Sequence, residues 1–117
     1  MFVKLQQFRE WIDYIYTNKI INKQKLSINE VSSGYTKVYE LCTSQKNTDL
    51  HKLLLDLYLE YCQKIYTIFN NNDAQLPIKE VISIFKYLDR YYLLKNTKEL
   101  KNLKIYADEI CAISTIQ

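Results

Sequence analysis

The chain has 117 residues, 48% hydrophobic and 25% charged, which is typical of one folded domain and excludes a disordered chain. One glycine and one proline are too few for the tight turns of a β-rich fold, and a net charge of +3 is too small to indicate nucleic-acid binding. We therefore expect one all-α domain over residues 1–117, a single bundle of about five helices.

The first two expected helices carry apolar residues at spacings of three and four. The first runs from Phe2 to Tyr16 and is followed by a loop or a frayed helix end. The second runs from Ser27 to Cys42, and Ser27 with Glu30 forms the capping-box pattern. Gly34 costs this helix up to about 1 kcal/mol relative to alanine, which suggests that another backbone comes close there. The inward stripe of the second helix is Ile28, Val31, Tyr35, Val38 and Cys42.

The third expected helix, Asp49 to Phe69, is apolar around most of its circumference. One apolar stripe is Leu50, Leu53, Leu54, Leu57, Tyr58, Tyr61 and Ile65, and a second is Leu55, Leu59, Cys62 and Tyr66. Only the row Asp56, Glu60, Gln63 and Thr67 is clearly polar. A helix of this kind packs on at least two sides, so we expect it at the centre of the bundle.

The stretch NNNDAQLP, residues 70–77, predicts the longest loop of the domain, with Pro77 in the first turn of the next helix. That fourth helix runs from Pro77 to Leu94 and a fifth begins near Thr97. The residues expected to face inward on the fourth helix are Ile78, Val81, Ile82, Phe85, Leu88 and Tyr92. Those on the fifth are Leu100, Leu103, Tyr106, Ile110 and Ile113.

The residue types that carry catalysis or bind metals are sparse. His51 is the single histidine, and Cys42, Cys62 and Cys111 form no C-x-x-C pair, so we expect buried thiols in a reducing compartment. No catalytic residue, metal or cofactor is predicted, although spacing alone does not exclude a Cys–His pair. The first residues carry no signal-peptide pattern, and no apolar run reaches membrane-spanning length, so we expect an intracellular protein of the cytoplasm or nucleus.

Part of the second helix, YTKVYELCTS at residues 35–44, crowds tyrosines, a cysteine and hydroxyl side chains together. This segment resembles the N-terminal repeat of cullins, the scaffold subunits of ubiquitin ligases, where a YTxVYxYCTS-like helix occurs. Three further segments resemble cullin landmarks in the same order. They are residues 15–17, residues 50–62 against an LYxxLxxFLxxYL helix, and residues 87–92 against a YLNRxW helix.

In cullins, the second and fifth helices of the first repeat bind a BTB-fold adaptor, which recruits the substrate receptor. The resemblance therefore implies a non-catalytic scaffold or adaptor-binding module of a ubiquitin ligase complex in ubiquitin-dependent degradation, without nucleic-acid, membrane or small-molecule partners. It implies that Val38 and Cys42 face the core. The second helix and the Pro77–Leu94 helix would supply the adaptor-binding residues, namely Val31, Tyr35, Thr36, Tyr39, Tyr91 and Tyr92.

Two features depart from the cullin pattern. A helix that cullins have before the YLNRxW segment is replaced by residues 70–77, and the sequence covers only one repeat. The alternatives are therefore a free-standing decoy that occupies the adaptor, or a helical structural or protein-interaction domain unrelated to ubiquitin ligases. An enzyme is the third and least favoured alternative.

Overall fold

The structure, a computed structural model, describes residues 3–44, 48–89 and 102–116 of the chain. All regular secondary structure in these residues is helical and none is strand, which confirms the all-α prediction. The elements in chain order are α1 (Val3–Ile15), the π-helix η1 (Tyr16–Ile20), α2 (Ile28–Ser44), α3 (Thr48–Ile68), α4 (Asn71–Ile84), the short α5 (Lys86–Leu88) and α7 (Leu103–Ile116).

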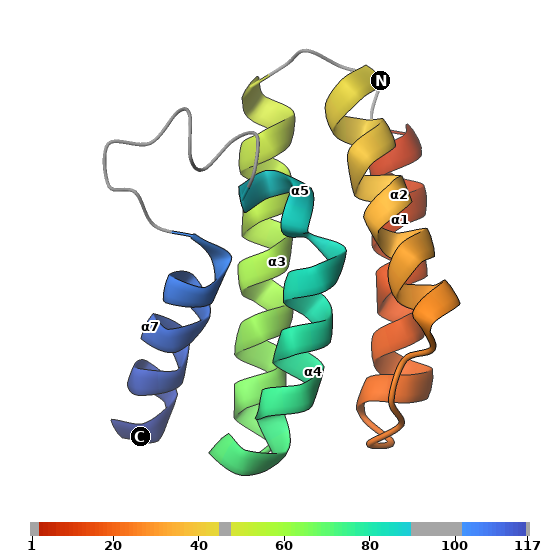
Figure 1. Cartoon of the computed structure of the whole chain (residues 1–117). Helices are drawn as coiled ribbons and strands as arrows, with labels where there is room; N and C mark the ends of the chain where they lie inside the picture. The colour runs from red at the N-terminus through yellow and green to blue at the C-terminus, as the bar shows by residue number, and fades with distance from the viewer. Residues whose placement is uncertain (1–2, 45–47, 90–101, 117) are drawn as a thin grey trace.

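The helices form two antiparallel pairs and a flanking helix (Figure 1). α3 and α4 make the central pair, α1 and α2 pack together on one side of it, and α7 lies on the other side against α3 and α4. α5 continues from α4 and contacts α2. This arrangement places α3 between two layers, which confirms its predicted central position.

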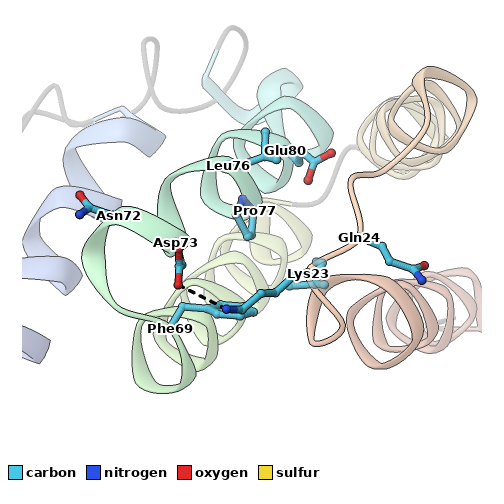
Figure 2. Close-up of a pocket in the computed structure, with 9 residues that line it drawn as sticks. Lys23, Gln24, Phe69, Asn72, Asp73, Leu76, Pro77 and Glu80 are labelled. Carbon is cyan, nitrogen blue, oxygen red and sulfur yellow. Dashed lines mark hydrogen bonds and ion pairs between the residues drawn. The ribbon is translucent and has the colours of Figure 1, made fainter.

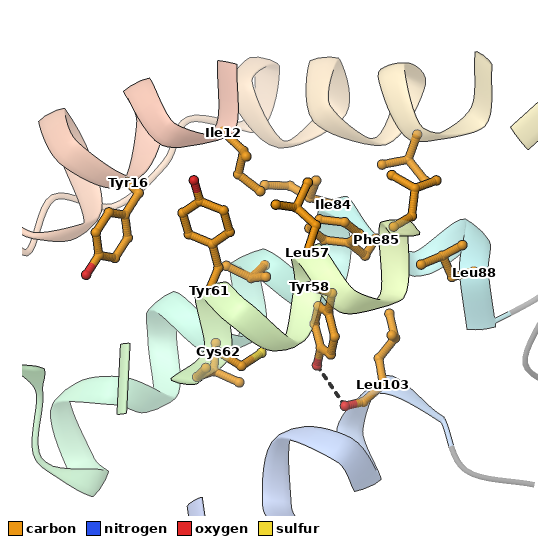
Figure 3. Close-up of a cluster of buried hydrophobic side chains, with 14 of the residues drawn as sticks. Ile12, Tyr16, Leu57, Tyr58, Tyr61, Cys62, Ile84, Phe85, Leu88 and Leu103 are labelled. Atoms are coloured by element: carbon orange, nitrogen blue, oxygen red, sulfur yellow. Dashed lines mark hydrogen bonds between the residues drawn. The ribbon is translucent and has the colours of Figure 1, made fainter. Parts of the chain in front are cut away.

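The aromatic core joins three segments that are distant in sequence (Figure 3). Phe8 of α1 and Tyr58 of α3 each pack edge-to-face against Phe85, with ring centroids 5.6 and 5.4 Å apart. Tyr61 of α3 packs edge-to-face against Tyr16 at 5.4 Å. Such rings bury large apolar areas and prefer this edge-to-face geometry, so they fix α1 and the end of α4 against the central helix.

The expected loop at residues 70–77 is wrong, because this stretch begins α4. Asn70 is the N-cap, and its side-chain oxygen accepts a hydrogen bond of 2.7 Å from the backbone N–H of Asp73. Asparagine is therefore a start signal here rather than a loop signal. Pro77 lies inside the helix and not in its first turn, so α3 and α4 are joined by Phe69 and Asn70 alone.

The expected fourth helix is interrupted at Phe85, where α4 ends and α5 begins. Phe85 has φ −91° and ψ 9°, outside the helical region, and its ring is fully buried. The aromatic contacts of this ring with α1 and α3 offset the cost of breaking the helix. The break places Tyr87 on α5 and not on α4, whereas the sequence predicted one continuous helix through both.

Buried polar groups hold the start of α7 in place. The carboxylate of Asp89 accepts a hydrogen bond of 2.7 Å from the Leu103 N–H, and the Tyr58 hydroxyl donates to the Leu103 carbonyl at 2.7 Å. The expected inward stripe of this helix is partly wrong, because Ile113 is 62% exposed, whereas Ala107, which was not part of the stripe, is buried. Leu100 of the expected stripe lies outside the described residues.

Gly34 marks a close contact between helices, as its position in α2 suggested. A Cβ atom built at Gly34 lies 2.8 Å from the Trp11 ring and 2.9 Å from a methyl carbon of Ile84. The groups that approach are therefore side chains of α1 and α4, and not the backbone that the sequence led us to expect. Gly34 lets α2 settle between these two helices.

Candidate protein-interaction surface

The capping box at the start of α2 is formed as predicted. The Glu30 N–H donates to the Ser27 hydroxyl at 3.1 Å, and the Ser27 N–H donates to the Glu30 carboxylate at 2.8 Å. This backbone hydrogen bond holds the pKa of Glu30 below its ordinary value, despite an opposing effect of burial. The cap fixes where α2 begins and therefore which of its residues face outward.

The outward surface of α2 carries no charged side chain along one row of residues. We call this row the α2 outer face, and it consists of Ile28, Ser32, Thr36, Tyr39 and Thr43, all exposed and separated by four, four, three and four residues. Ile28 is 85% exposed, so its predicted inward position is wrong: as the first residue of α2 it lies at the edge of the bundle. An exposed helix row without charge is unusual, because solvent-facing rows normally carry charged residues.

The charged residues of α2 lie outside this row, and Glu40 is its nearest charged neighbour, four residues after Thr36. Glu30 belongs to the capping box, and Glu40 lines the groove between α1 and α2. Lys37 places its ammonium 5.4 Å from the centre of the Trp11 ring on α1, a cation–π contact. Glu30 and Lys37 are thus used at contacts with the preceding linker and with α1, whereas Glu40 is exposed beside the α2 outer face, on the side toward α1.

Three tyrosines gather where α2 meets α5. The Tyr39 and Tyr87 rings pack edge-to-face with centroids 5.2 Å apart, and the Tyr35 and Tyr87 rings do so at 6.4 Å. Tyr39 is 46% exposed, whereas Tyr35 and Tyr87 are half-buried. We call these three residues the tyrosine cluster. It extends the α2 outer face onto a second element, with aromatic area that reaches solvent through Tyr39.

The structure places the predicted site residues of α2 as follows. Thr36 and Tyr39 lie on the outer face, Tyr35 lies in the tyrosine cluster, and Val31 is half-buried and packs against the core. The predicted site residues Tyr91 and Tyr92 lie outside the described residues. Tyr87 was not among the predicted site residues, although its place four residues before Tyr91 in the YLDRYY segment was an available signal.

Val38 and Cys42 face the core, in agreement with the sequence-based expectation. Burial raises the pKa of the Cys42 thiol to about 12, and burial likewise raises that of Cys62 to about 12. Both thiols are therefore protonated at neutral pH and are weak nucleophiles. Cys111 differs from the buried-thiol prediction, because it is only half-buried and its sulfur lies 3.2 Å from a side-chain oxygen of Asn71.

The described residues contain neither a metal-binding cluster nor a membrane-spanning helix. Over residues 3–44, 48–89 and 102–116, no three His, Cys, Asp or Glu side chains gather in a way that suits a metal ion. Within the same part of the chain, no helix combines the length and the apolar character needed to cross a bilayer. Comparison with family models, with curated proteins and with solved structures gave no match to this chain.

Proposed function

We propose that this protein is a cullin-like, adaptor-binding module of a ubiquitin ligase complex. It binds a BTB-fold adaptor through the α2 outer face and the tyrosine cluster, together with the predicted contacts Tyr91 and Tyr92. The observation that carries the proposal is the combination of a charge-free exposed row on α2 with aromatic area shared between α2 and α5. α2 contains the YTKVYELCTS segment, and α5 contains Tyr87 and Leu88, the first two residues of the YLDRYY segment; the sequence resembles cullins in both segments.

The composition of the surface supports this kind of function. The cores of protein interfaces are depleted in charged residues and enriched in aromatic residues, above all tyrosine and tryptophan. Tyr39 combines exposed ring area with a hydroxyl group, so it can bury apolar surface while donating a hydrogen bond at the rim. Thr36 is a short neighbour whose side chain leaves room for a partner residue beside that ring.

The order of the helices also supports the proposal. Cullins have a helix between the segment that residues 50–62 resemble and the YLNRxW segment. The loop expected at residues 70–77 would have removed it, but α4 stands at that position, because it begins at Asn71 and ends before α5. A helix between these two segments is compatible with the cullin pattern and in this way supports the proposal.

The proposal is tested with a panel of purified BTB-fold adaptors, each offered to the immobilised protein. Retention of at least one adaptor by the parent protein is expected. Thr36→Arg places a long charged side chain on the α2 outer face and should abolish retention of that adaptor, since an unpaired charge is costly at an interface. Gln63→Arg is the matched control, because Gln63 is also exposed but lies on the polar row of α3.

Each result of this experiment has a definite meaning. Retention that survives Thr36→Arg, or is lost equally in Gln63→Arg, contradicts the assignment of the binding surface. Failure of every adaptor to bind contradicts the ligase assignment and favours an unrelated helical interaction domain. Thermal melting of both variants excludes unfolding as the cause, because surface substitutions of this type change stability by about 0.5 kcal/mol or less.

A further inference from the structure

A pocket of about 250 Å³ lies between η1, the linker after it, and the first turns of α4 (Figure 2). Its apolar wall consists of Ile20, Phe69, Leu76 and Pro77. The pocket lies near the beginning of α4, whereas α5 and the tyrosine cluster lie toward the other end of that helix (Figure 1). It is therefore a separate feature from the surface proposed above, and its volume suits a single long side chain rather than a whole small molecule.

The buried carboxylate of Glu80 lines this pocket and has no cation partner among the described residues. Glu80 is 8% exposed, and its Oε2 atom accepts a hydrogen bond of 2.7 Å from the Leu26 N–H. No described donor contacts the second oxygen, Oε1, and Lys25 is near enough to act on the carboxylate only through its charge. A mostly buried carboxylate with one oxygen accessible from the pocket favours a positively charged, hydrogen-bonding ligand.

A second set of acceptors lies at Asp73, one turn before Pro77. Proline has no N–H, so the Asp73 carbonyl lacks its usual donor four residues later in the helix. The Asp73 carboxylate lies 3.4 Å from the Lys23 ammonium across the pocket (Figure 2). The side chain of Lys23 is 67% exposed and that of Asp73 is 46% exposed, and an exposed ion pair of this kind contributes little to stability. The Lys23 side chain therefore occupies the Asp73 end of the pocket, and an incoming ligand can displace it at little cost.

The separation of these two acidic groups defines the length of the ligand. Asp73 and Glu80 are seven residues apart in α4, about 10 Å along the helix axis, with Leu76 and Pro77 between them. A side chain entering beside Asp73 needs a long apolar stem to place a cationic group at Glu80. Arginine has this shape, and its planar guanidinium carries five N–H donors for several oxygen acceptors.

We propose that this pocket binds an arginine side chain of a partner protein. The stem lies against Leu76 and Pro77, the guanidinium donates to the free carboxylate oxygen of Glu80, and the partner backbone passes near Asp73, where it displaces Lys23. An inorganic cation is a poorer fit, because no third metal-binding side chain joins the two carboxylates within the described part of the chain. The proposal does not depend on the identity of the adaptor.

The test is an NMR titration of the intact protein with a blocked peptide that contains one arginine, compared with the same peptide containing citrulline. Citrulline has nearly the same shape but no charge. We expect saturable shifts at the amides of Leu76 and Glu80, and binding of the citrulline peptide at least about tenfold weaker, because a charge-assisted hydrogen bond is lost. Lys23→Ala should tighten binding of the arginine peptide, since it removes the lysine side chain that must move from the Asp73 end of the pocket when the peptide backbone enters.

Two further variants test whether arginine binding depends on this pocket or on acidic side chains in general. Glu80→Gln keeps an oxygen that can accept from Leu26 but removes the charge, so it should weaken arginine binding about tenfold. Asp108→Asn is the control, because Asp108 is an exposed carboxylate paired with Lys104 on α7, and it should bind like the parent protein. Equal binding of both peptides, or equal binding to the parent and Glu80→Gln, would overturn the proposal, as would a complete lack of shifts.

Discussion

Two regions of this molecule use tyrosine in opposite ways. Tyr58 in the centre of α3 is fully buried, and its hydroxyl donates to the Leu103 carbonyl at 2.7 Å, which ties α7 to the central helix. Tyr39 on α2 is 46% exposed, and its ring rests on Tyr87 at the edge of the bundle. The same side chain therefore serves as a core residue with an internal hydrogen bond in one region and as exposed aromatic surface in the other.

The difference lies in the surroundings of each helix. α3 packs against α4 and α7, and its Tyr61 hydrogen-bonds to Asp13 of α1, so other helices cover most of its surface except the polar row that includes Gln63. α2 is covered on its inner side only, and its outer face meets solvent within the described structure. Burial also changes the chemistry, because desolvation raises the pKa of Tyr58 far above its ordinary value of 10.0. The Tyr58 phenol is therefore protonated at neutral pH and can donate its hydrogen bond to Leu103.

The largest expected effect is the loss of folding stability when the buried tyrosine of α3, Tyr58, is removed. Tyr58→Ala removes a fully buried ring and its hydrogen bond, and we expect a loss of about 3–5 kcal/mol in the free energy of unfolding. Chemical denaturation of both proteins measures this difference. A loss below about 1 kcal/mol would contradict the central position of α3 and would remove the contrast with Tyr39.

A smaller loss is expected at the boundary between the regions. Gly34→Ala places a methyl group within 3.0 Å of the Trp11 ring and Ile84, so α2 must shift outward or these side chains must move. Overpacking of this kind costs about 1–3 kcal/mol, although alanine is the better helix former by about 1 kcal/mol. Thermal melting should show net destabilisation. An increase in stability would indicate that α2 is less tightly seated than the structure describes.

Glu80 is a buried group that can ionise, so its contribution to stability should depend on pH, unlike that of the buried Tyr58 hydroxyl. Burial raises the pKa of its carboxyl group above the ordinary value of 4.5, and the negative charge of Glu30 adds to this, while the hydrogen bond from Leu26 and the charge of Lys25 oppose it. Because the folded-state pKa lies above the unfolded one, the stabilising contribution of the protonated group is fully present below about pH 4.5 and is lost as the pH rises through the folded-state value.

The variant Glu80→Gln should therefore behave differently at the two ends of this pH range. The amide can still accept from Leu26 but does not ionise, so the stability of the variant relative to the parent should be higher at pH 7 than at pH 4. Denaturant titrations at both pH values measure this change. A relative stability that does not change, or changes with the opposite sign, would contradict the direction of the pKa shift.

The smallest expected change in stability is at Tyr39. Its ring is half exposed and rests on Tyr87, so Tyr39→Ala should cost much less than Tyr58→Ala, on the order of 0.5–1.5 kcal/mol for the lost edge-to-face contact. Parallel denaturant titrations of the two variants measure the ratio directly. Comparable losses would mean that Tyr39 is a core residue and not part of an exposed surface.

Periodicity predicted the features that depend on large apolar areas. The all-α class, the central position of α3 and the inward direction of Val38 and Cys42 all follow from spacings of three and four. It failed where one residue type has two structural uses. Asn70 is typical of loops and Pro77 of a first helical turn, but here Asn70 caps a helix and Pro77 lies further inside it. Phe85 breaks the expected helix because its ring is held by tertiary contacts.

The candidate surface was predictable only in part, for a related reason. Tyr35, Thr36 and Tyr39 were named from the resemblance of one segment, and their partner Tyr87 was missed because it depends on where the chain turns at Phe85. The absence of charge from the α2 outer face is visible in the sequence only once the inward direction of the helix is known. The Glu80 pocket likewise depends on the linker after η1, which no periodic pattern describes.

The most direct test of the proposed surface compares two exposed tyrosines in one binding experiment. Tyr39 belongs to the α2 outer face, whereas Tyr14 is 60% exposed on α1 and lies outside both that face and the tyrosine cluster. In calorimetric titration with a BTB-fold adaptor that the parent retains, Tyr39→Ala should weaken binding at least about tenfold, as expected for an aromatic anchor. Tyr14→Ala should bind as the parent does. Equal affinity of the two variants for that adaptor would contradict the account.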